Sequence, residues 1–271
     1  MEERITRLGE GLETNGKIST DAMQRVIDAL REYKQMGLAA GVEEFRVFAT
    51  SATRDAMNRN EFLALISRLG FRCRVLSGDE EAFLSYIGVM SDEQEYGPFL
   101  VCDIGGGSTE FILGNKTSLL QKKSIDIGSR RLHARFLHSD PVKEEEVSAM
   151  RVFLRRILQQ ELAAMSGQMA KSIAVGGTAT TLAMMDSSID VRDADKAHKH
   201  VLVRERLSSI IADLASKTIA ERKSIRGLHP GRADVILAGA LIVESIMQYF
   251  DLPFIAISIR DLLFGALLKW D

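Results

Sequence analysis

Apolar residues along the chain recur with two periods, one typical of helices and one typical of strands. After Ser19 or Thr20 they stand three and four positions apart, as at Met23 and Ile27, which predicts an amphipathic helix with one buried face. The segment Phe71–Leu76 instead alternates apolar residues with arginines, as a half-buried strand does. The two patterns replace one another throughout the sequence, so the expected fold class is α/β.

The same patterns predict further elements along the chain. Apolar runs predict strands, and apolar residues at helical spacing next to a capping residue or a closing glycine predict helices. The expected strands are Phe45–Thr50, Ser118–Lys122, Ser124–Ile127, Lys171–Val175 and Phe254–Ser258. The expected helices start at Asn60, Gly128 and Asp140-Pro141, and cover Arg204–Leu214, Ile219–Arg226, Gly231–Phe250 and Arg260–Trp270.

The chain is organised around residues 99–113, which predict two strands joined by a glycine turn. Phe99–Ile104 is an apolar run broken only by Asp103, and Thr109–Leu113 resumes the extended pattern with Glu110. The turn consists of Gly105, Gly106, Gly107 and Ser108, and Thr109 adds a second hydroxyl. Without Cβ atoms, backbone N–H groups can close on an anion. A phosphate cradle flanked by two acids indicates a phosphate held with Mg²⁺, which favours carboxylate and phosphate oxygens.

A tight hairpin that needs small residues explains the same glycines about equally well, because a glycine run alone is a weak signal. Two better-defined nucleotide loops are excluded by their spacing. No G-x-x-x-x-G-K-[ST] occurs, so the turn is not a Walker loop. The dinucleotide fingerprint is also absent, since Glu110 stands where its third glycine belongs.

A second glycine turn follows the expected strand Lys171–Val175. Gly176, Gly177 and Thr178 lead into a helix, and a helix start offers free N–H groups and a positive dipole end to an anion. A short turn with a threonine cap is the common alternative. Two such loops in one chain favour a phosphate ligand more strongly than either does alone.

Another helix start carries adjacent acids. Ser77 and Glu80 form a capping box, which assigns Glu80 a structural task. Glu81 is rotated by about 100° around the helix, so the cap does not account for it. The pattern alone favours a solvated acid in the first turn for Glu81.

The composition excludes several classes of protein. The 271 residues allow one large domain or two ordinary ones, and a net charge of −2 provides no basic field for nucleic acid or an anionic membrane. Cys73 and Cys102 are the two cysteines, and they lack zinc-site spacing. The N-terminus has no apolar signal segment and no apolar run has the length of a membrane span, so a cytoplasmic location is expected.

Five blocks of the sequence resemble, in order and spacing, the exopolyphosphatase / guanosine pentaphosphate phosphohydrolase (Ppx/GppA) family. The blocks are ATSATRDAMN (Ala49–Asn58), VLSGDEEAFLSYIGV (Val75–Val89), VCDIGGGSTEFILG (Val101–Gly114), AVGGTATTLAMM (Ala174–Met185) and GRADVILAGALIV (Gly231–Val243). The resemblance implies the fold of the actin / sugar kinase / Hsp70 superfamily, with two ribonuclease H-like lobes and an interlobe cleft. Residues 1–79 with 259–271 would form the first lobe, and residues 80–258 the second.

Matching positions carry roles over from the family. Glu81 matches the catalytic Glu that orients or deprotonates the attacking water, and Arg54 matches an Arg that neutralises phosphate oxygens. Asp103 and Glu110 match the acids that support Mg²⁺ and the water. The phosphate-binding positions are Gly105, Gly106, Gly107, Ser108, Thr109, Gly176, Gly177 and Thr178. The implied reaction is in-line attack of water on a terminal phosphoanhydride.

Two departures from the family pattern concern the ends of the chain. The family's initial D-x-G-[ST]-N-S turn is absent, so a truncated first lobe is expected. In the family's S-D-x-G-L-R-E-G, the Asp, Arg and Glu positions hold Ile259, Leu263 and Phe264.

The expected function is release of terminal phosphate from inorganic polyphosphate, guanosine pentaphosphate or both, with Mg²⁺ as cofactor. A binding or regulatory protein that hydrolyses these ligands poorly is the alternative, and an ATP-using kinase of the same fold is a third, weaker hypothesis. The sequence does not rank the two substrates. The family is compatible with a homodimer, and neither nucleic acid nor a membrane is an expected partner.

Overall fold

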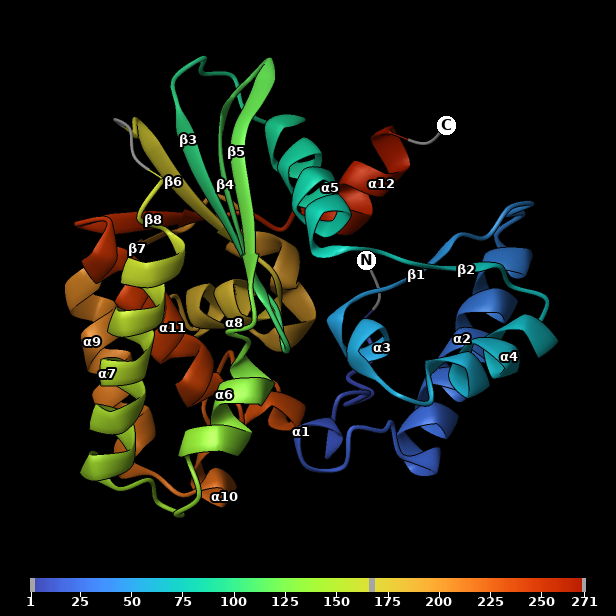
Figure 1. Cartoon of the computed structure of the whole chain (residues 1–271), viewed down its shortest axis with the longest axis horizontal. Coiled ribbons are helices and arrows are strands. Elements are labelled where there is room, and N and C mark those ends of the chain that lie inside the picture. Colours follow the sequence, from blue (N-terminus) through green and yellow to red (C-terminus); the bar gives the residue numbers. More distant parts are fainter. Residues whose placement is uncertain (1–2, 166–168, 270–271) are drawn as a thin grey trace. The chain divides into compact units, whose positions relative to one another are not determined.

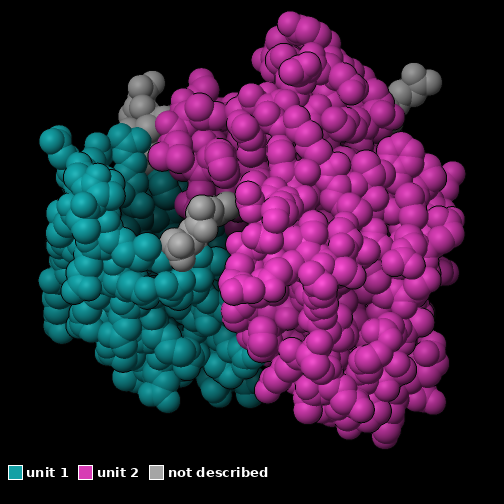
Figure 2. Space-filling view, turned by 180° about the vertical axis from the view of Figure 1, so that it is seen from behind, with its two compact units in different colours: residues 1–77 teal, residues 78–271 magenta. Residues whose placement is uncertain are grey.

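The computed structural model describes residues 3–165 and 169–269 and divides into two compact units. Unit 1 comprises Met1–Ser77 and unit 2 comprises Gly78–Asp271. Figure 2 colours the two units separately. In both units strands and helices alternate along the chain, which confirms the predicted α/β class.

Unit 1 is built from a two-stranded parallel sheet and its helices. Its elements are α1 (Leu12–Asn15), α2 (Thr20–Ala39), β1 (Val47–Ala49), α3 (Ser51–Asp55), α4 (Arg59–Arg68) and β2 (Cys73–Val75). The hydroxyl oxygen of Ser19 accepts the N–H of Ala22 at 3.2 Å, which confirms the cap expected for α2. The apolar faces of α2 and α4 form the core of the unit, with Met23, Ile27, Phe62 and Ile66 buried.

The start of α4 differs from the prediction that Asn60 caps it. The helix begins at Arg59, and the preceding Asn58 uses its side chain elsewhere. Its Oδ1 accepts the N–H of Ile18 and its Nδ2 donates to the Ile18 carbonyl, both at 2.9 Å. A long-range contact therefore fixes this helix start, which local spacing does not reveal.

Unit 2 contains a six-stranded mixed sheet in the order β5-β4-β3-β6-β8-β7 (Figure 1). The strands are β3 (Phe99–Ile104), β4 (Thr109–Asn115), β5 (Ser118–Ile125), β6 (Lys171–Val175), β7 (Val201–Val203) and β8 (Phe254–Ile257). β3 and β4 pair as an antiparallel hairpin around the glycine turn, as predicted, and β6 runs parallel to β3. The two expected pieces at residues 118–127 form the single strand β5.

Helices cover both faces of this sheet. They are α5 (Gly78–Met90), α6 (Ser129–Phe136), α7 (Glu144–Glu161), α8 (Gly177–Asp186), α9 (Arg204–Ser216), α10 (Ile219–Arg222), α11 (Ile236–Tyr249) and α12 (Leu262–Leu268), with 3-10 turns at Val191–Ala197 and Pro230–Arg232. Leu100, Cys102 and Ile104 of β3 face the large core under α6, α7, α8 and α11. Phe99 and Val101 face the smaller core under α5, because alternate side chains of a strand point to opposite faces.

Two helices begin later than their sequence patterns predicted. α7 starts at Glu144 rather than at Asp140-Pro141, and Glu146 accepts the N–H groups of Lys143 and Ser139 at 3.1 Å. Glu146 is thus part of the helix cap. α11 starts at Ile236, because residues 230–232 form a separate 3-10 turn.

The last helix packs closely along α5. A Cβ on Gly265 would overlap the carbonyl oxygen of Leu84, and a Cβ on Gly88 would overlap that of Asp261. The two backbones touch because both contact positions lack side chains. Within unit 2, α12 therefore packs directly on α5. The division into lobes at 1–79 with 259–271 and at 80–258 stays a prediction.

In the described parts of the chain, no helix combines the length and apolar character that crossing a bilayer would demand.

We expect Gly265→Ala to destabilise unit 2, since the added methyl group overlaps backbone that cannot easily move. Overpacking of this kind costs about 1–3 kcal/mol, which outweighs the roughly 1 kcal/mol by which alanine is the better helix former. Urea unfolding monitored by circular dichroism measures the change in the free energy of unfolding. Leu267→Ala is the control on the same helix, because its side chain is 77% exposed. A Gly265→Ala protein as stable as the control would contradict the tight crossing.

Candidate active site

The alternation of the sheet places the two acids of the hairpin on the α5 side. Asp103 on β3 stands directly opposite Glu110 on β4 in the antiparallel register. Asp103 stands two positions from Val101 on its strand, and Glu110 stands two positions from Ile112, so each pair points to the same face of the sheet. Val101 and Ile112 belong to the core under α5. Asp103 is 8% exposed and Glu110 is fully buried. The hairpin therefore presents two buried carboxyl groups to one helix.

The first two turns of α5 supply a third acid and a hydroxyl donor. Glu81 is buried, and Ser85 follows it one helical turn later on the same face. The Ser85 hydroxyl donates to Oδ2 of Asp103. From the edge strand β5, the Ser124 hydroxyl donates to Oε1 of Glu110 at 2.7 Å. Each hairpin acid is thus held by a serine from a different element.

Burial and mutual repulsion make these acids hard to ionise. Burial raises the pKa of Asp103 to about 7. The hydrogen bond from Ser85 lowers this pKa, whereas the negative charges of Glu81 and Asp261 raise it further. Burial likewise raises the pKa of Glu110 to about 8, with further contributions from Glu81 and Asp103. A cation between them would relieve the repulsion.

Two buried oxygen atoms point to a ligand at this place. Ser108 is close enough to lower the pKa of Glu110, yet Ser108 Oγ and Glu110 Oε2 satisfy no hydrogen bond among residues 3–165 and 169–269. Buried polar atoms normally have partners. No group of three or more potential metal-ligating side chains occurs in these residues. A cation here would therefore share its coordination with a substrate or water, as Mg²⁺ commonly does.

The glycine turn is anchored by the start of α6. The Gly105 carbonyl accepts the N–H of Ser129 at 3.0 Å and the Gly106 carbonyl that of Arg130 at 2.9 Å. Since C=O and N–H of a trans peptide point in opposite directions, the N–H groups following these carbonyls face away from α6. Gly128 makes this contact possible, because a Cβ there would overlap the Gly106 backbone. The turn thus presents N–H groups, as an anion cradle requires.

The second glycine turn touches the first acid. Gly176 adopts a φ of 90°, and a Cβ on it would lie 2.8 Å from Oδ1 of Asp103. Gly177 opens α8, so the positive end of the helix dipole lies beside the carboxyl groups. Thr178 is buried. The structure therefore brings both predicted loops and the acids Glu81, Asp103 and Glu110 together within unit 2.

Three residues at this site were missed by the sequence analysis. Ser85 had a usable signal, its position one turn after Glu81. Ser124 had none, since its neighbour Glu110 lies on the preceding strand. Arg232 had been placed inside a long helix, but its guanidinium group lies against Gly177, where a Cβ would overlap it.

Arg54 belongs to unit 1, so its predicted catalytic role stays a prediction. It lies on α3, and its Nη1 donates to the carbonyl oxygen of Leu76 at 2.9 Å. This bond ties α3 to the segment that follows β2. The metal-binding role of Asp103 and Glu110 likewise stays a prediction.

Comparisons of the sequence and of the structure with known proteins agree on one protein family. The model of the Ppx/GppA phosphatase family matches residues 1–270. Exopolyphosphatase 2 of Mycobacterium tuberculosis is 36% identical over 255 residues, covering 91% of this chain and 80% of that protein. The structure of a Ppx/GppA family member from Aquifex aeolicus has a TM-score of 0.80 at 31% identity, covering 98% of this chain and 86% of its own.

An exopolyphosphatase structure from Cytophaga hutchinsonii has a TM-score of 0.84 at 28% identity, with 96% of this chain and 85% of its own covered. The likeness extends over nearly the whole of each chain. It confirms the expected α/β fold class.

We expect Glu110→Gln to stabilise the ligand-free protein at pH 8 more than at pH 5. The pKa of Glu110 in the folded state, about 8, lies above its unfolded value of about 4.3. Between these values the folded state binds more protons than the unfolded state, so its stability falls as pH rises. The glutamine has no such loss. The melting temperature measures the difference in stability between the variant and the wild type, with a change of about 2–4 °C for each kcal/mol.

Glu145→Gln is the matched control, because this acid is exposed on α7. Its effect on the melting temperature should be small at both pH values. Equal shifts for Glu110→Gln at pH 5 and pH 8 would show that this carboxyl group is not held protonated by its surroundings.

Proposed function

The chain belongs to the Ppx/GppA phosphatase family, and from this premise we propose that it hydrolyses the terminal phosphoanhydride bond of inorganic polyphosphate. The observation that carries the proposal is the convergence of three buried acids with two glycine turns in unit 2. The relatives named exopolyphosphatase favour polyphosphate as the substrate. Guanosine pentaphosphate presents the same terminal phosphoanhydride chemistry and is the second substrate to test.

In the proposed reaction, groups of the chain position the attacking water and the terminal phosphate, and they neutralise the charge of the phosphate. The N–H groups of the first glycine turn and of the α8 start hold the terminal phosphoryl oxygens. Arg232, which lies against Gly177, would add a positive charge to this cradle. Glu81 orients the attacking water and takes its proton as the bond to phosphorus forms. Catalysis then rests on alignment and charge neutralisation, because phosphoryl transfer asks little else of the protein.

The residues present fit Mg²⁺ as the cofactor. Glu110 Oε2 is a buried oxygen atom left without a hydrogen bond among residues 3–165 and 169–269, and Asp103 lies opposite it in the hairpin. These two carboxylates would hold the ion together with phosphate oxygens. When bound, Mg²⁺ neutralises charge on the phosphate and lowers the cost of ionising both acids.

The alternative, a protein that binds phosphate chains but hydrolyses them poorly, also has an observation in its favour. Ile259, Leu263 and Phe264 stand where the family pattern has Asp, Arg and Glu, so polar groups of the family motif are missing there. The turnover number of the purified chain separates the two functions, since a binding protein would retain polyphosphate without releasing phosphate.

We expect Glu81→Gln to reduce phosphate release from polyphosphate in the presence of Mg²⁺ by about 10²–10⁴-fold, the usual contribution of a positioned general base. Polyphosphate binding should persist, because the glycine turns remain. Asp79→Asn is the control, since this acid of the same helical turn is 66% exposed and pairs with Lys122. Phosphate release at equal rates by wild type and Glu81→Gln would remove Glu81 from the mechanism.

A further inference from the structure

A second group of polar side chains lies at the end of α8 that is remote from the glycine turns. Ser187, His200 and Asp186 form a series of hydrogen bonds there, here called the Ser187 triad. We propose that Ser187 is a nucleophile that accepts acyl groups from activated esters, with His200 as its general base. This activity does not rest on the proposed phosphatase reaction, because α8 separates Gly177 from Asp186 by about 14 Å.

The hydrogen bonds run in the order that a Ser–His–Asp triad requires. Oδ2 of Asp186 accepts from Nε2 of His200 at 2.8 Å. In a neutral imidazole the other nitrogen, Nδ1, is then an acceptor, and it lies 3.0 Å from Oγ of Ser187. The ring nitrogens exchange their roles relative to the serine proteases, but each contacts its own partner. The Ser187 hydroxyl therefore donates its proton toward a base that a carboxylate orients.

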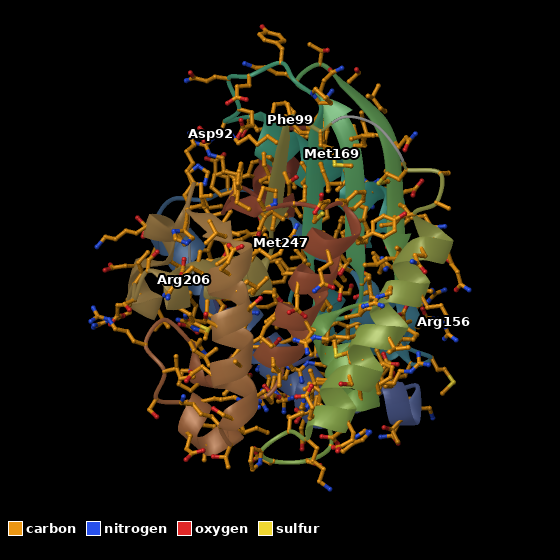
Figure 3. The ribbon with its side chains drawn as sticks, turned by 90° about the vertical axis from the view of Figure 1, so that its left-hand side faces the viewer. Asp92, Phe99, Arg156, Met169, Arg206 and Met247 are labelled. Atoms are coloured by element: carbon orange, nitrogen blue, oxygen red, sulfur yellow. The ribbon has the colours of Figure 1, made fainter. Side chains whose placement is uncertain are left out.

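Burial increases from the hydroxyl to the acid. Ser187 is exposed, whereas the side chains of His200 and Asp186 are 21% and 10% exposed. Oδ1 of Asp186 also accepts from Nε of Arg206 at 2.9 Å, so the charge of the acid is balanced. Figure 3 shows Arg206 at the surface of unit 2. A small ester can thus reach the hydroxyl, while the base and the acid are held behind it.

Backbone contacts position the hydroxyl and the ring from two separate elements. The N–H of Ser187 donates to the carbonyl of Ala183 at 3.0 Å and ends α8. Ser188 then adopts a φ of 52°, a left-handed conformation that turns the chain sharply. On the other side, the His200 carbonyl accepts the N–H of Ile257 of β8 at 2.8 Å. The geometry of the triad therefore follows from the ends of a helix and of a strand.

The serines of the neighbouring helix show the ordinary use of such a hydroxyl. Ser208, Ser209 and Ser216 of α9 donate to backbone carbonyls three or four residues earlier, at 2.9–3.1 Å. Ser187 also stands at a helix end, but its hydroxyl contacts an imidazole nitrogen. Satisfying the helix end does not explain this contact.

A second histidine offers a natural comparison. Nε2 of His198 lies 2.8 Å from Oδ2 of Asp92, so His198 is paired with a carboxylate in the same way. Its Nδ1 accepts the backbone N–H of Ile259 at 3.4 Å, and a backbone amide is no nucleophile. Figure 3 shows Asp92 and Arg206 apart from each other, so the two pairs are separate. Of the two pairs, the one with His200 holds a group that can react.

The helix end favours an acyl group over a phosphoryl group on Ser187. The residue follows the last turn of α8, where the helix dipole is negative. A phosphoryl group would bring about two negative charges to this end, next to Asp186, and like charge disfavours it there. An acyl group carries no charge. An activated ester is therefore the donor class that fits the site.

The proposed reaction has two steps. Oγ of Ser187 bonds to the carbonyl carbon of the ester while its proton moves to Nδ1 of His200. The bond from this carbon to the alcohol oxygen breaks, and the alcohol leaves with the proton from His200. Water that His200 deprotonates then attacks the acyl serine, which releases the carboxylic acid and restores the hydroxyl.

Acetylation by p-nitrophenyl acetate tests the proposal in the whole chain. We expect the acetyl group on Ser187, located by peptide mass spectrometry, at a rate about 10²-fold above that of His200→Gln, because a positioned base contributes at least this much. Asp186→Asn should also lose rate, since an amide does not orient the ring as a carboxylate does. His198→Gln is the matched control, since it removes the other histidine–carboxylate pair, and it should acetylate Ser187 at the wild-type rate.

Ser187→Ala keeps the test independent of folding, because it removes one exposed hydroxyl. This variant should lose the release of p-nitrophenolate that accompanies acetylation, with its melting temperature and its phosphate release from polyphosphate unchanged. Equal acetylation of Ser187 in wild type and His200→Gln, or of Ser187 and Ser208 in the wild type, would overturn the proposal. Acetyl phosphate can donate either group, and phosphorylation of Ser187 by it would overturn the assignment to acyl donors.

Discussion

Three carboxyl groups buried against one another are the constraint on which the rest of unit 2 depends. Asp103 and Glu110 face each other across a hairpin, and Glu81 adds its charge from α5. Such a cluster costs free energy in the ligand-free fold, since burial and like charge both oppose ionisation. The register of β3 and β4 places the two hairpin acids opposite each other, and hydrogen bonds from Ser85 and Ser124 hold them there.

Glycines set how closely the surrounding backbone approaches these acids. Gly128 lets α6 touch the first turn, Gly176 lets the second turn touch Asp103, and Gly177 admits Arg232. Any side chain at these positions would meet backbone, a carboxyl oxygen or a guanidinium group. The same device joins α5 to α12 through Gly88 and Gly265, which ties the helix that carries Glu81 to the last helix of the chain.

Local pattern predicted the elements and the loops, but not the contacts between them. The hairpin, β6 and both glycine turns follow from runs of apolar residues and from glycines, which act within a few positions. The prediction that Asn60 caps α4 was wrong, because the contact of Asn58 with Ile18, 40 residues away, fixes the start of this helix. Ser124 and Arg232 could not be found for the same reason, as their partners lie on other elements. Glu81 needed the family resemblance, because its pattern alone fitted a solvated acid.

The proposed function asks an acidic site to bind a negatively charged phosphate chain, so positive groups must lie between the acids and the phosphate. In the proposed function, backbone N–H groups and the α8 dipole would approach the phosphate without the bulk of a charged side chain, and Asp103 and Glu110 would hold Mg²⁺. Arg232 stands one step outward, against Gly177. In the proposed function these groups would neutralise the phosphate and leave Glu81 to orient the attacking water.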